Sequence, residues 1–185
     1  MHKLGADERR FLLEAARRAL ETYLDGGERP AFEAATQGLR EHRAAFVTLR
    51  TDGQLRGCRG EAEPRRPLID SVIDGAIAAA TDDPRFEPVG RQELDRATIH
   101  ISALTPPRPV EPRAIELGRH GLILSYRGRS GLLLPQVPEL YGLRTVDEFL
   151  ESLRRKARLP EGVLDQPGVR LLGFEAEAWG EGPES

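Results

Sequence analysis

Apolar residues recur at helical spacing in three stretches of the chain. The first covers residues 7–24, with Asp7 as the expected N-cap and a Gly-Gly pair after its end. The second covers residues 67–81, where a proline precedes the apolar pattern and Asp-Asp-Pro follows it. The third follows Thr145, because Thr145 and Glu148 have the spacing of a capping box. The pattern therefore predicts three helices.

Shorter apolar or alternating runs predict strands. They are residues 45–49, 55–58, 97–104, 122–126, 132–134 and 169–178. Asp52-Gly53 and the segment 127–130 separate neighbouring runs in the manner of tight hairpin turns. The last run, in which Phe174 alternates with Glu175, is expected to be one continuous strand. Hairpins mixed with helices indicate an α+β fold with a mostly antiparallel sheet and flanking helices.

The length of 185 residues fits a single domain over residues 1–180, with 181–185 as a flexible tail. The net charge of −3 argues against general nucleic-acid binding. No apolar run approaches the roughly 18 residues of a membrane span, and the N-terminus lacks the apolar core of a signal peptide. The single cysteine rules out an internal disulfide framework. These features favour a cytoplasmic protein that does not bind a membrane.

The most informative chemistry lies in the hexapeptide Leu55-Arg56-Gly57-Cys58-Arg59-Gly60. Its arginines supply positive potential that favours a thiolate, and its glycines allow close approach of the backbone. We expect the cysteine at the end of a hairpin strand that enters a loop. A reactive thiol, a redox thiol, a soft metal ligand and a buried structural residue are all open readings of Cys58. No Cys or His lies at ligand spacing from it, so no metal site is expected.

Two protein classes can be tested against this hexapeptide by spacing and context. A cysteine phosphatase needs an arginine six positions after the nucleophile, and Pro64 stands there. That class is therefore excluded. A Gly-x-x-Gly nucleic-acid clamp belongs between helices, whereas this segment follows a predicted strand.

Three further residues could serve a site. His120 lies in a polar turn before an apolar run and could act as a general base, or it is an exposed turn residue. Gln136 follows a strand and could orient a substrate, or it satisfies backbone groups beside a proline. Arg85 comes just after the Asp82-Asp83-Pro84 helix stop and could bind an anion, or it pairs locally within the turn.

At these motifs the chain resembles the AMMECR domain family, including the AmmeMemoRadiSam system protein A group. The resemblance covers residues 8–180. It is carried by Phe46-Val47-Thr48-Leu49, the hexapeptide, Asp83-Pro84-Arg85-Phe86-Glu87-Pro88-Val89, Ile101-Ser102-Ala103-Leu104-Thr105-Pro106-Pro107, His120-Gly121-Leu122 and Gly131-Leu132-Leu133-Leu134-Pro135-Gln136-Val137. Three positions depart from the family pattern: Arg59 stands where the family has isoleucine, and a tryptophan near Tyr141 and a cysteine near Leu153 are missing.

The resemblance implies a fold with a larger and a smaller lobe and the hexapeptide on a cleft between them. It also implies a partnership with a Memo-like protein and a radical SAM enzyme. Radical chemistry would belong to the radical SAM enzyme, because this chain lacks the three-cysteine iron–sulfur motif. No cofactor of its own is expected.

Our leading hypothesis is a cleft around Cys58 that acts on or holds a small anionic or nucleotide-like ligand. In it Cys58 is the reactive thiol, Arg56 stabilises negative charge, and Gly57 and Gly60 allow close approach. Arg59 strengthens anion binding or points to solvent. The alternatives are a non-catalytic binding or adaptor module and a purely structural motif.

Overall fold

The computed structural model describes residues 3–182 and divides into two compact units. The first unit contains the chain up to Ala103 and from Glu177 onward, and the second contains Leu104–Ala176. The predicted α+β class is confirmed, because both units combine helices with an antiparallel sheet. In chain order the elements are α1 (Ala6–Gly26), α2 (Gln37–Arg40), β1 (Ala45–Thr51), β2 (Gln54–Gly60), α3 (Leu68–Thr81), α4 (Arg91–Leu94), β3 (Ala97–Leu104), β4 (Arg108–Pro109), η1 (Pro112–Ala114), β5 (Gly121–Tyr126), β6 (Arg129–Leu133), α5 (Val137–Tyr141), α6 (Val146–Lys156), η2 (Val163–Asp165), β7 (Arg170–Phe174) and β8 (Ala176–Gly180).

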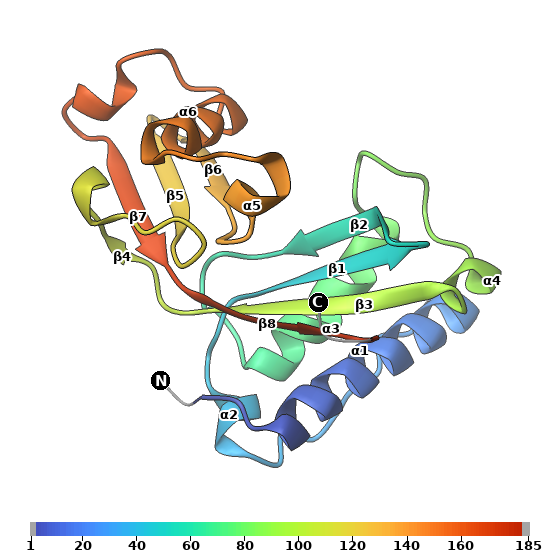
Figure 1. Cartoon of the computed structure of the whole chain (residues 1–185). Helices are drawn as coiled ribbons and strands as arrows, with labels where there is room; N and C mark the ends of the chain where they lie inside the picture. Colours follow the sequence, from blue (N-terminus) through green and yellow to red (C-terminus); the bar gives the residue numbers. More distant parts are fainter. Residues whose placement is uncertain (1–2, 183–185) are drawn as a thin grey trace. The chain divides into compact units, whose positions relative to one another are not determined.

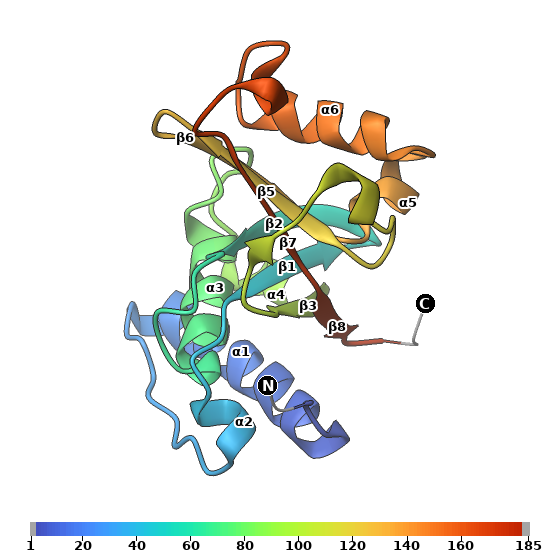
Figure 2. The ribbon, with the colours of Figure 1, turned by 90° about the vertical axis from the view of Figure 1, so that its left-hand side faces the viewer.

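The first unit is a four-stranded sheet of order β2-β1-β3-β8 with α1 and α3 on one face (Figure 1). The view of Figure 2 shows the same two helices on the same side of this sheet. Alternate residues of β1, such as Val47 and Leu49, are fully buried against these helices, together with Ile99 and Ile101 of β3. The other residues of β1, including Thr48, point to the opposite face. The alternation of apolar and polar residues in the sequence therefore decides which face of the sheet receives the helices.

The hairpin of β1 and β2 turns at Asp52 and Gly53, which both have positive φ angles of 53° and 77°. Two such residues are what a two-residue hairpin loop requires. The predicted position of Cys58 at the end of this hairpin strand is wrong: it lies inside β2 and pairs with Thr48 of β1. The strand continues to Gly60 because Arg59 and Gly60 also pair with β1. The strand propensity of these two residues did not indicate this pairing.

A β-bulge interrupts the same hairpin. Leu49 pairs with Gly57 and Arg50 pairs with Leu55, so Arg56 is the extra residue of β2. A bulge bends the strand and redirects the side chains next to it. Arg56 therefore does not follow the simple alternation of the strand.

The second unit is a sheet of order β4-β7-β5-β6, with α6 packed against β5 and β6 (Figure 1). Phe149 and Leu153 of α6 are fully buried, together with Leu122 and Leu124 of β5. The β5–β6 hairpin has Arg127 and Gly128 in its turn, again with positive φ angles. The two predicted strands and the helix after them are thus confirmed.

The single strand predicted over residues 169–178 is instead two strands in different sheets. The chain changes sheet at Glu175, whose N–H donates to Thr105 Oγ1 and whose carbonyl oxygen accepts from the Thr105 N–H, both at 2.8 Å. The apolar–polar alternation runs through this point without interruption. The two-residue periodicity of the sequence therefore could not reveal that the strand divides into β7 and β8.

Two ends of the chain differ in detail from the prediction. The first helix begins after Gly5, whose N–H donates to Glu8 Oε2 at 2.9 Å, so Asp7 lies in the first turn and is not the N-cap. Glu181, the first residue of the expected tail, accepts from the Ile99 N–H at 2.9 Å and pairs with Arg17. Residues 183–185 of that tail lie outside the described part of the chain.

The capping box at the start of α6 is confirmed, with Glu148 N–H donating to Thr145 Oγ1 at 3.2 Å and Thr145 N–H donating to Glu148 Oε2 at 3.0 Å. We expect Thr145→Ala to lower the free energy of unfolding of the second unit by about 1 kcal/mol, because the cap hydroxyl is lost. Urea denaturation followed by far-UV circular dichroism measures this. Thr145→Ser is the control, since it keeps the hydroxyl and should change stability by less than half as much.

In residues 3–182, no helix combines the length and the apolar character that a membrane span requires.

Candidate functional site

The two glycines of the hexapeptide lie against the backbone of the first unit. A Cβ on Gly57 would lie 2.0 Å from the carbonyl oxygen of Ala79 in α3. A Cβ on Gly60 would lie 2.1 Å from the carbonyl oxygen of Ala45 and 2.6 Å from Cα of Phe46. Such distances are far inside van der Waals contact, so no side chain fits at either position. Both glycines therefore have a packing reason that is independent of any ligand.

Cys58 is half-buried and occupies the face of the sheet opposite to α3. Its Sγ lies 3.2 Å from Oγ1 of Thr48, its partner across the hairpin. A threonine hydroxyl can donate to a thiolate or accept from a thiol. The sulfur thus has a polar neighbour on the adjacent strand.

The backbone of Cys58 is bound by a buried carboxylate. Strand β2 is the edge of its sheet, and the Cys58 N–H donates to Asp83 Oδ2 at 2.9 Å. Arg85 donates to the same carboxylate through Nε at 2.9 Å and through Nη2 at 2.6 Å. The side chain of Asp83 is only 3 % exposed. The hydrogen bonds from Arg85, reinforced by the Cys58 N–H, hold the Asp83 pKa well below its usual range, although burial alone would raise it.

Arg56 forms an ion pair with Glu93, next to the ion pair of Arg85 with Asp83. Its Nε and Nη2 donate to Glu93 Oε1 and Oε2 at 2.5 and 3.0 Å, so the carboxylate binds side-on. The guanidinium carbons of Arg56 and Arg85 lie 5.8 and 5.5 Å from the centre of the Phe86 ring. The loop after α3 therefore joins both arginines to one aromatic ring. Each guanidinium next to Cys58 is matched by its own carboxylate.

A row of polar side chains crosses the sheet at Cys58. Thr48 stands opposite Cys58 on one side and opposite His100 on the other. Because strands lie about 4.8 Å apart, the backbones of Cys58 and His100 are separated by about 10 Å, with Thr48 between them. Among the described residues, Cys58 Sγ contacts Thr48 and His100 Nε2 contacts Thr98, so the two side chains are not hydrogen-bonded to each other. Burial, followed by the charge of Arg50, lowers the pKa of His100, so its ring is neutral at pH 7. A Cβ on Gly180 would lie 2.2 Å from His100 Nδ1, so this glycine gives the ring its space.

Arg59 does not share the face of Cys58. It lines a hollow with Ser71, Asp74 and Gly75 of α3, on the side of the sheet where the helices pack. Alternation along β2 places neighbouring residues on opposite faces, which accounts for this. Among the residues predicted for one site, the structure brings together Arg56, Cys58 and Arg85 and separates Arg59 from them.

His120 and Gln136 belong to the second unit. His120 lies directly before β5, as predicted, and its Nδ1 accepts from the Glu116 N–H at 3.0 Å. The His120 N–H in turn donates to the Glu116 carbonyl oxygen at 3.0 Å, which closes the turn. Gln136 is the N-cap residue of α5. The turn role that the sequence left open for His120 thus has a structural counterpart, whereas the Gln136 side chain makes no capping hydrogen bond to the backbone of α5.

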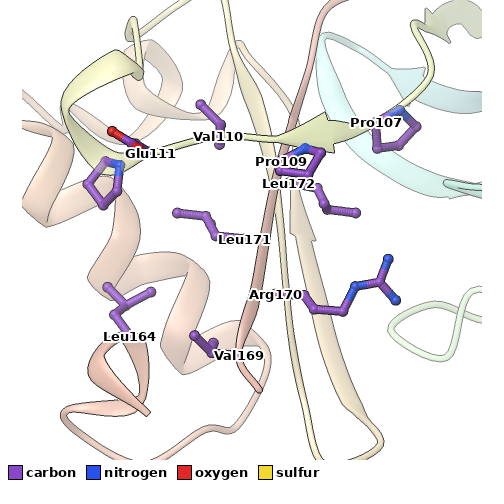
Figure 3. A pocket seen from close by; sticks show the side chains of 10 residues that line it. Pro107, Pro109, Val110, Glu111, Leu164, Val169, Arg170, Leu171 and Leu172 are labelled. Carbon is purple, nitrogen blue, oxygen red and sulfur yellow. The ribbon is translucent and has the colours of Figure 1, made fainter. Parts of the chain in front are cut away.

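The second unit also contains a cavity of about 510 Å³ along β4 and β7 (Figure 3). Its lining is mainly proline, leucine and valine, with Glu111 and Arg170 as the charged members. In Figure 3 the Leu171 and Leu172 side chains extend to opposite sides of β7. None of the residues predicted for the site lines this cavity.

Within residues 3–182, no group of three or more His, Cys, Asp or Glu side chains is arranged to hold a metal ion.

Comparison with known proteins places the chain in a family. The family model described as AMMECR1 matches residues 13–179. The chain belongs to the AMMECR1 family. It is 42 % identical to Protein MK0488 of Methanopyrus kandleri over 97 % of this chain and 91 % of that protein. It is 41 % identical to Protein MJ0810 of Methanocaldococcus jannaschii over 98 % of this chain and 94 % of that protein.

A solved structure supports the fold of this AMMECR1-family protein. The crystal structure of the uncharacterized protein PH0010 from Pyrococcus horikoshii matches with a TM-score of 0.87 and 39 % identity. The match covers 92 % of this chain and 90 % of that chain. The family and the α+β fold indicated by the sequence motifs are therefore confirmed.

Several residues around the AMMECR1 hexapeptide were not singled out from the sequence. Thr48, Phe86 and Glu93 contact Cys58 or Arg56, and Asp83, which the sequence offered as a carboxylate beside Arg85 at a helix end or as a turn residue, binds the Cys58 N–H. The Asp52-Gly53 turn alone would have paired Thr48 with Gly57, because hairpin register follows from the turn. Only the bulge at Arg56 shifts the register and places Thr48 opposite Cys58. No local signal could have found Glu93, which is 37 positions from Arg56.

Proposed function

We propose that this AMMECR1-family protein holds a small anionic or nucleotide-like ligand at the Cys58 face of its first unit. It does so as a non-catalytic binding module that acts together with a radical SAM enzyme and a Memo-like protein. Cys58, Arg56 and Arg85 are the contact residues of the ligand in this proposal. His120, Gln136, Gly57 and Gly60 stay candidates for the same function by sequence, whereas Arg59 faces the other side of β2 and is not part of this site.

The observation that carries the proposal is the matched pairing of the two arginines beside Cys58. The side-on pair with Glu93 uses Nε and Nη2 of Arg56 and leaves the N–H groups of Nη1 for a ligand. Arg85 is fixed by Asp83 while 54 % of its side chain stays exposed. Guanidinium groups that are fixed before a ligand arrives lose little rotamer entropy when they bind an anion.

The same pairing argues for binding over nucleophilic catalysis. Activation of a thiol requires uncompensated positive charge or an adjacent base. Both nearby guanidinium charges are matched by carboxylates, and His100 lies two strands away. A single feature favours the second candidate, an enzyme with Cys58 as its nucleophile: the Thr48 hydroxyl lies 3.2 Å from the sulfur and could donate to a thiolate.

The test uses Cys58 as its own reporter, because it is the only cysteine in the chain. Iodoacetamide alkylation, followed by intact mass, is measured with and without AMP as a nucleotide-like anionic probe. We expect saturating AMP to slow alkylation by about threefold or more, since it would cover the sulfur. Arg56→Gln should abolish this protection, whereas Arg10→Gln, on the exposed surface of α1, should keep it.

Two results would contradict the proposal. Alkylation that is unaffected by AMP and by inorganic phosphate would argue against an anion site at Cys58. Alkylation at neutral pH about tenfold faster than that of free cysteine would instead support the nucleophilic enzyme. Circular dichroism of each variant separates loss of binding from loss of folding.

A further inference from the structure

A second hollow in the first unit lies on the face of β2 opposite to Cys58. It runs between the end of β2 and one side of α3 and encloses about 170 Å³. Its lining consists of Arg59, Gly60, Glu61, Arg66, Ser71, Asp74, Gly75 and Ala78. A water molecule takes up about 30 Å³ of liquid, so this space is equivalent to about six waters. It suits a compact group and is below the usual size of nucleotide or drug pockets.

Ser71 supplies an unexplained polar atom in this hollow. The residue is 3 % exposed, and its Oγ is buried without a hydrogen-bond partner among the described residues. Buried hydroxyl groups are nearly always hydrogen-bonded, because leaving one without a partner is unfavourable. The backbone N–H of Ser71 is already bound to the carbonyl oxygen of Pro67 at 3.0 Å, so the helix is intact at this residue. The side-chain hydroxyl alone is left over.

The charges of the hollow leave one guanidinium without a counterpart. Arg66 pairs with Glu61 at 3.1 Å and also with Asp74. Asp74 additionally pairs with Arg29 at 2.5 Å. Arg59, by contrast, forms no ion pair with the described residues 3–182, although Glu61 and Asp74 line the same hollow. An arginine without an ion pair and a hydroxyl without a hydrogen-bond partner thus line the same small space.

We infer that this hollow is a binding site for a compact oxyanion, such as a phosphate or carboxylate group. Arg59 donates to the anion from the rim, and the Ser71 hydroxyl donates from the buried wall. Gly60 and Gly75 bring no side chain into the space. The carboxylates of Glu61 and Asp74 are occupied by arginines, so they do not repel the anion as free charges. This site is distinct from the Cys58 face and does not depend on the function proposed there.

The test measures binding of inorganic phosphate and of acetate to the full chain by isothermal titration calorimetry at constant ionic strength. We expect saturable binding of at least one of the two probes, and the stronger one identifies the class of oxyanion. Arg59→Gln should weaken that binding by about tenfold or more, because a charge-assisted hydrogen bond is lost. Ser71→Ala should also weaken it, by about threefold or more.

Ser71→Ala also separates a binding role from a structural role. Removing a buried hydroxyl that has no partner should leave the melting temperature unchanged or raise it, while oxyanion binding falls. The matched control is Arg10→Gln for general charge, which should bind phosphate and acetate like the unchanged protein. Phosphate bound at the Cys58 face is told apart by Arg56→Gln, which would remove that binding and leave the binding that depends on Arg59 and Ser71. Absence of saturable binding of both probes would overturn the inference. Arg59→Gln and Ser71→Ala variants that bind the probes as tightly as the unchanged protein would also overturn it.

Discussion

Gly57→Ala is expected to destabilise the first unit by about 3 kcal/mol or more, or to prevent its folding. The added methyl group would lie 2.0 Å from the carbonyl oxygen of Ala79, 3.1 Å from its carbonyl carbon and 3.7 Å from its Cα. All three atoms belong to the backbone of α3, so no side chain can rotate away to relieve the clash. Either α3 or β2 must move, although α3 contributes many residues to the buried core and β2 is paired with β1 along its length. Chemical denaturation with urea, monitored by circular dichroism, measures the loss.

Gly90→Ala is the matched control for this substitution. Gly90 has an ordinary φ of −80°, and a Cβ there would meet nothing within 4 Å. We expect a change of less than about 0.5 kcal/mol, because only the conformational freedom of the unfolded chain is altered. If the Gly57→Ala variant were as stable as the Gly90→Ala variant, the close packing of β2 on α3 would not explain why residue 57 is glycine. The glycine would then need a ligand-based explanation.

Asp83→Asn is expected to lower the free energy of unfolding by about 2–3 kcal/mol at pH 7. The buried carboxylate accepts from the Cys58 N–H, from the Arg85 N–H and from the Arg85 guanidinium. An asparagine directs an NH₂ group into this set of donors, so at least one of the four hydrogen bonds must be lost. Arg85 is half-exposed and keeps much of its solvation, which limits the effect. The same substitution removes the charge that holds Arg85 near Cys58, so protection of Cys58 by AMP should weaken as well.

The acid dependence of stability provides an independent test of Asp83. Its pKa is lower in the folded state than the value of about 3.9 expected in the unfolded chain. The carboxylate therefore contributes its full stabilisation above about pH 5 and loses it as the pH falls through 4 toward the folded pKa. The stability difference between the unchanged protein and Asp83→Asn should shrink between pH 6 and pH 3. Asp7→Asn, at an exposed position on α1, is the control and should show a small difference at every pH.

A constant difference across this pH range would contradict a buried, ionised Asp83. So would a larger loss of stability from Asp7→Asn than from Asp83→Asn. Urea titrations at several pH values distinguish these outcomes.

Local sequence signals predicted the elements of this protein well where a short-range physical requirement is strong. Asp52-Gly53 predicted a hairpin, and the turn has the two positive φ angles that such a loop needs. Thr145 and Glu148 predicted a helix start, and their side chains satisfy backbone groups there. In both cases the residues that interact are at most three positions apart, so a window of sequence contains the whole cause.

Contacts between distant segments were not predictable in the same way. Asp83 and Cys58 are 25 positions apart, and Arg56 and Glu93 are 37 apart. The sequence shows Asp83, Arg56 and Glu93 only as charged residues near a turn or strand. Only the packing of the loop after α3 on the edge of β2 makes them partners. The prediction that the arginines supply positive potential at the thiol was made without the carboxylates of Glu93 and Asp83, with which Arg56 and Arg85 pair.

By itself the sequence determined the family, the α+β class and the hairpins, because motifs and local periodicity encode them directly. The tertiary structure decided what each residue of the hexapeptide does. Gly57 and Gly60 are glycines because backbone atoms of α3 and β1 approach them, and Arg59 faces α3 because β2 continues past Cys58. The tertiary structure also decided that the last predicted strand divides at Glu175 into β7 and β8, which belong to different sheets. The physical reason is that burial, charge pairing and strand partners depend on which distant segment lies alongside, and a local pattern does not contain that information.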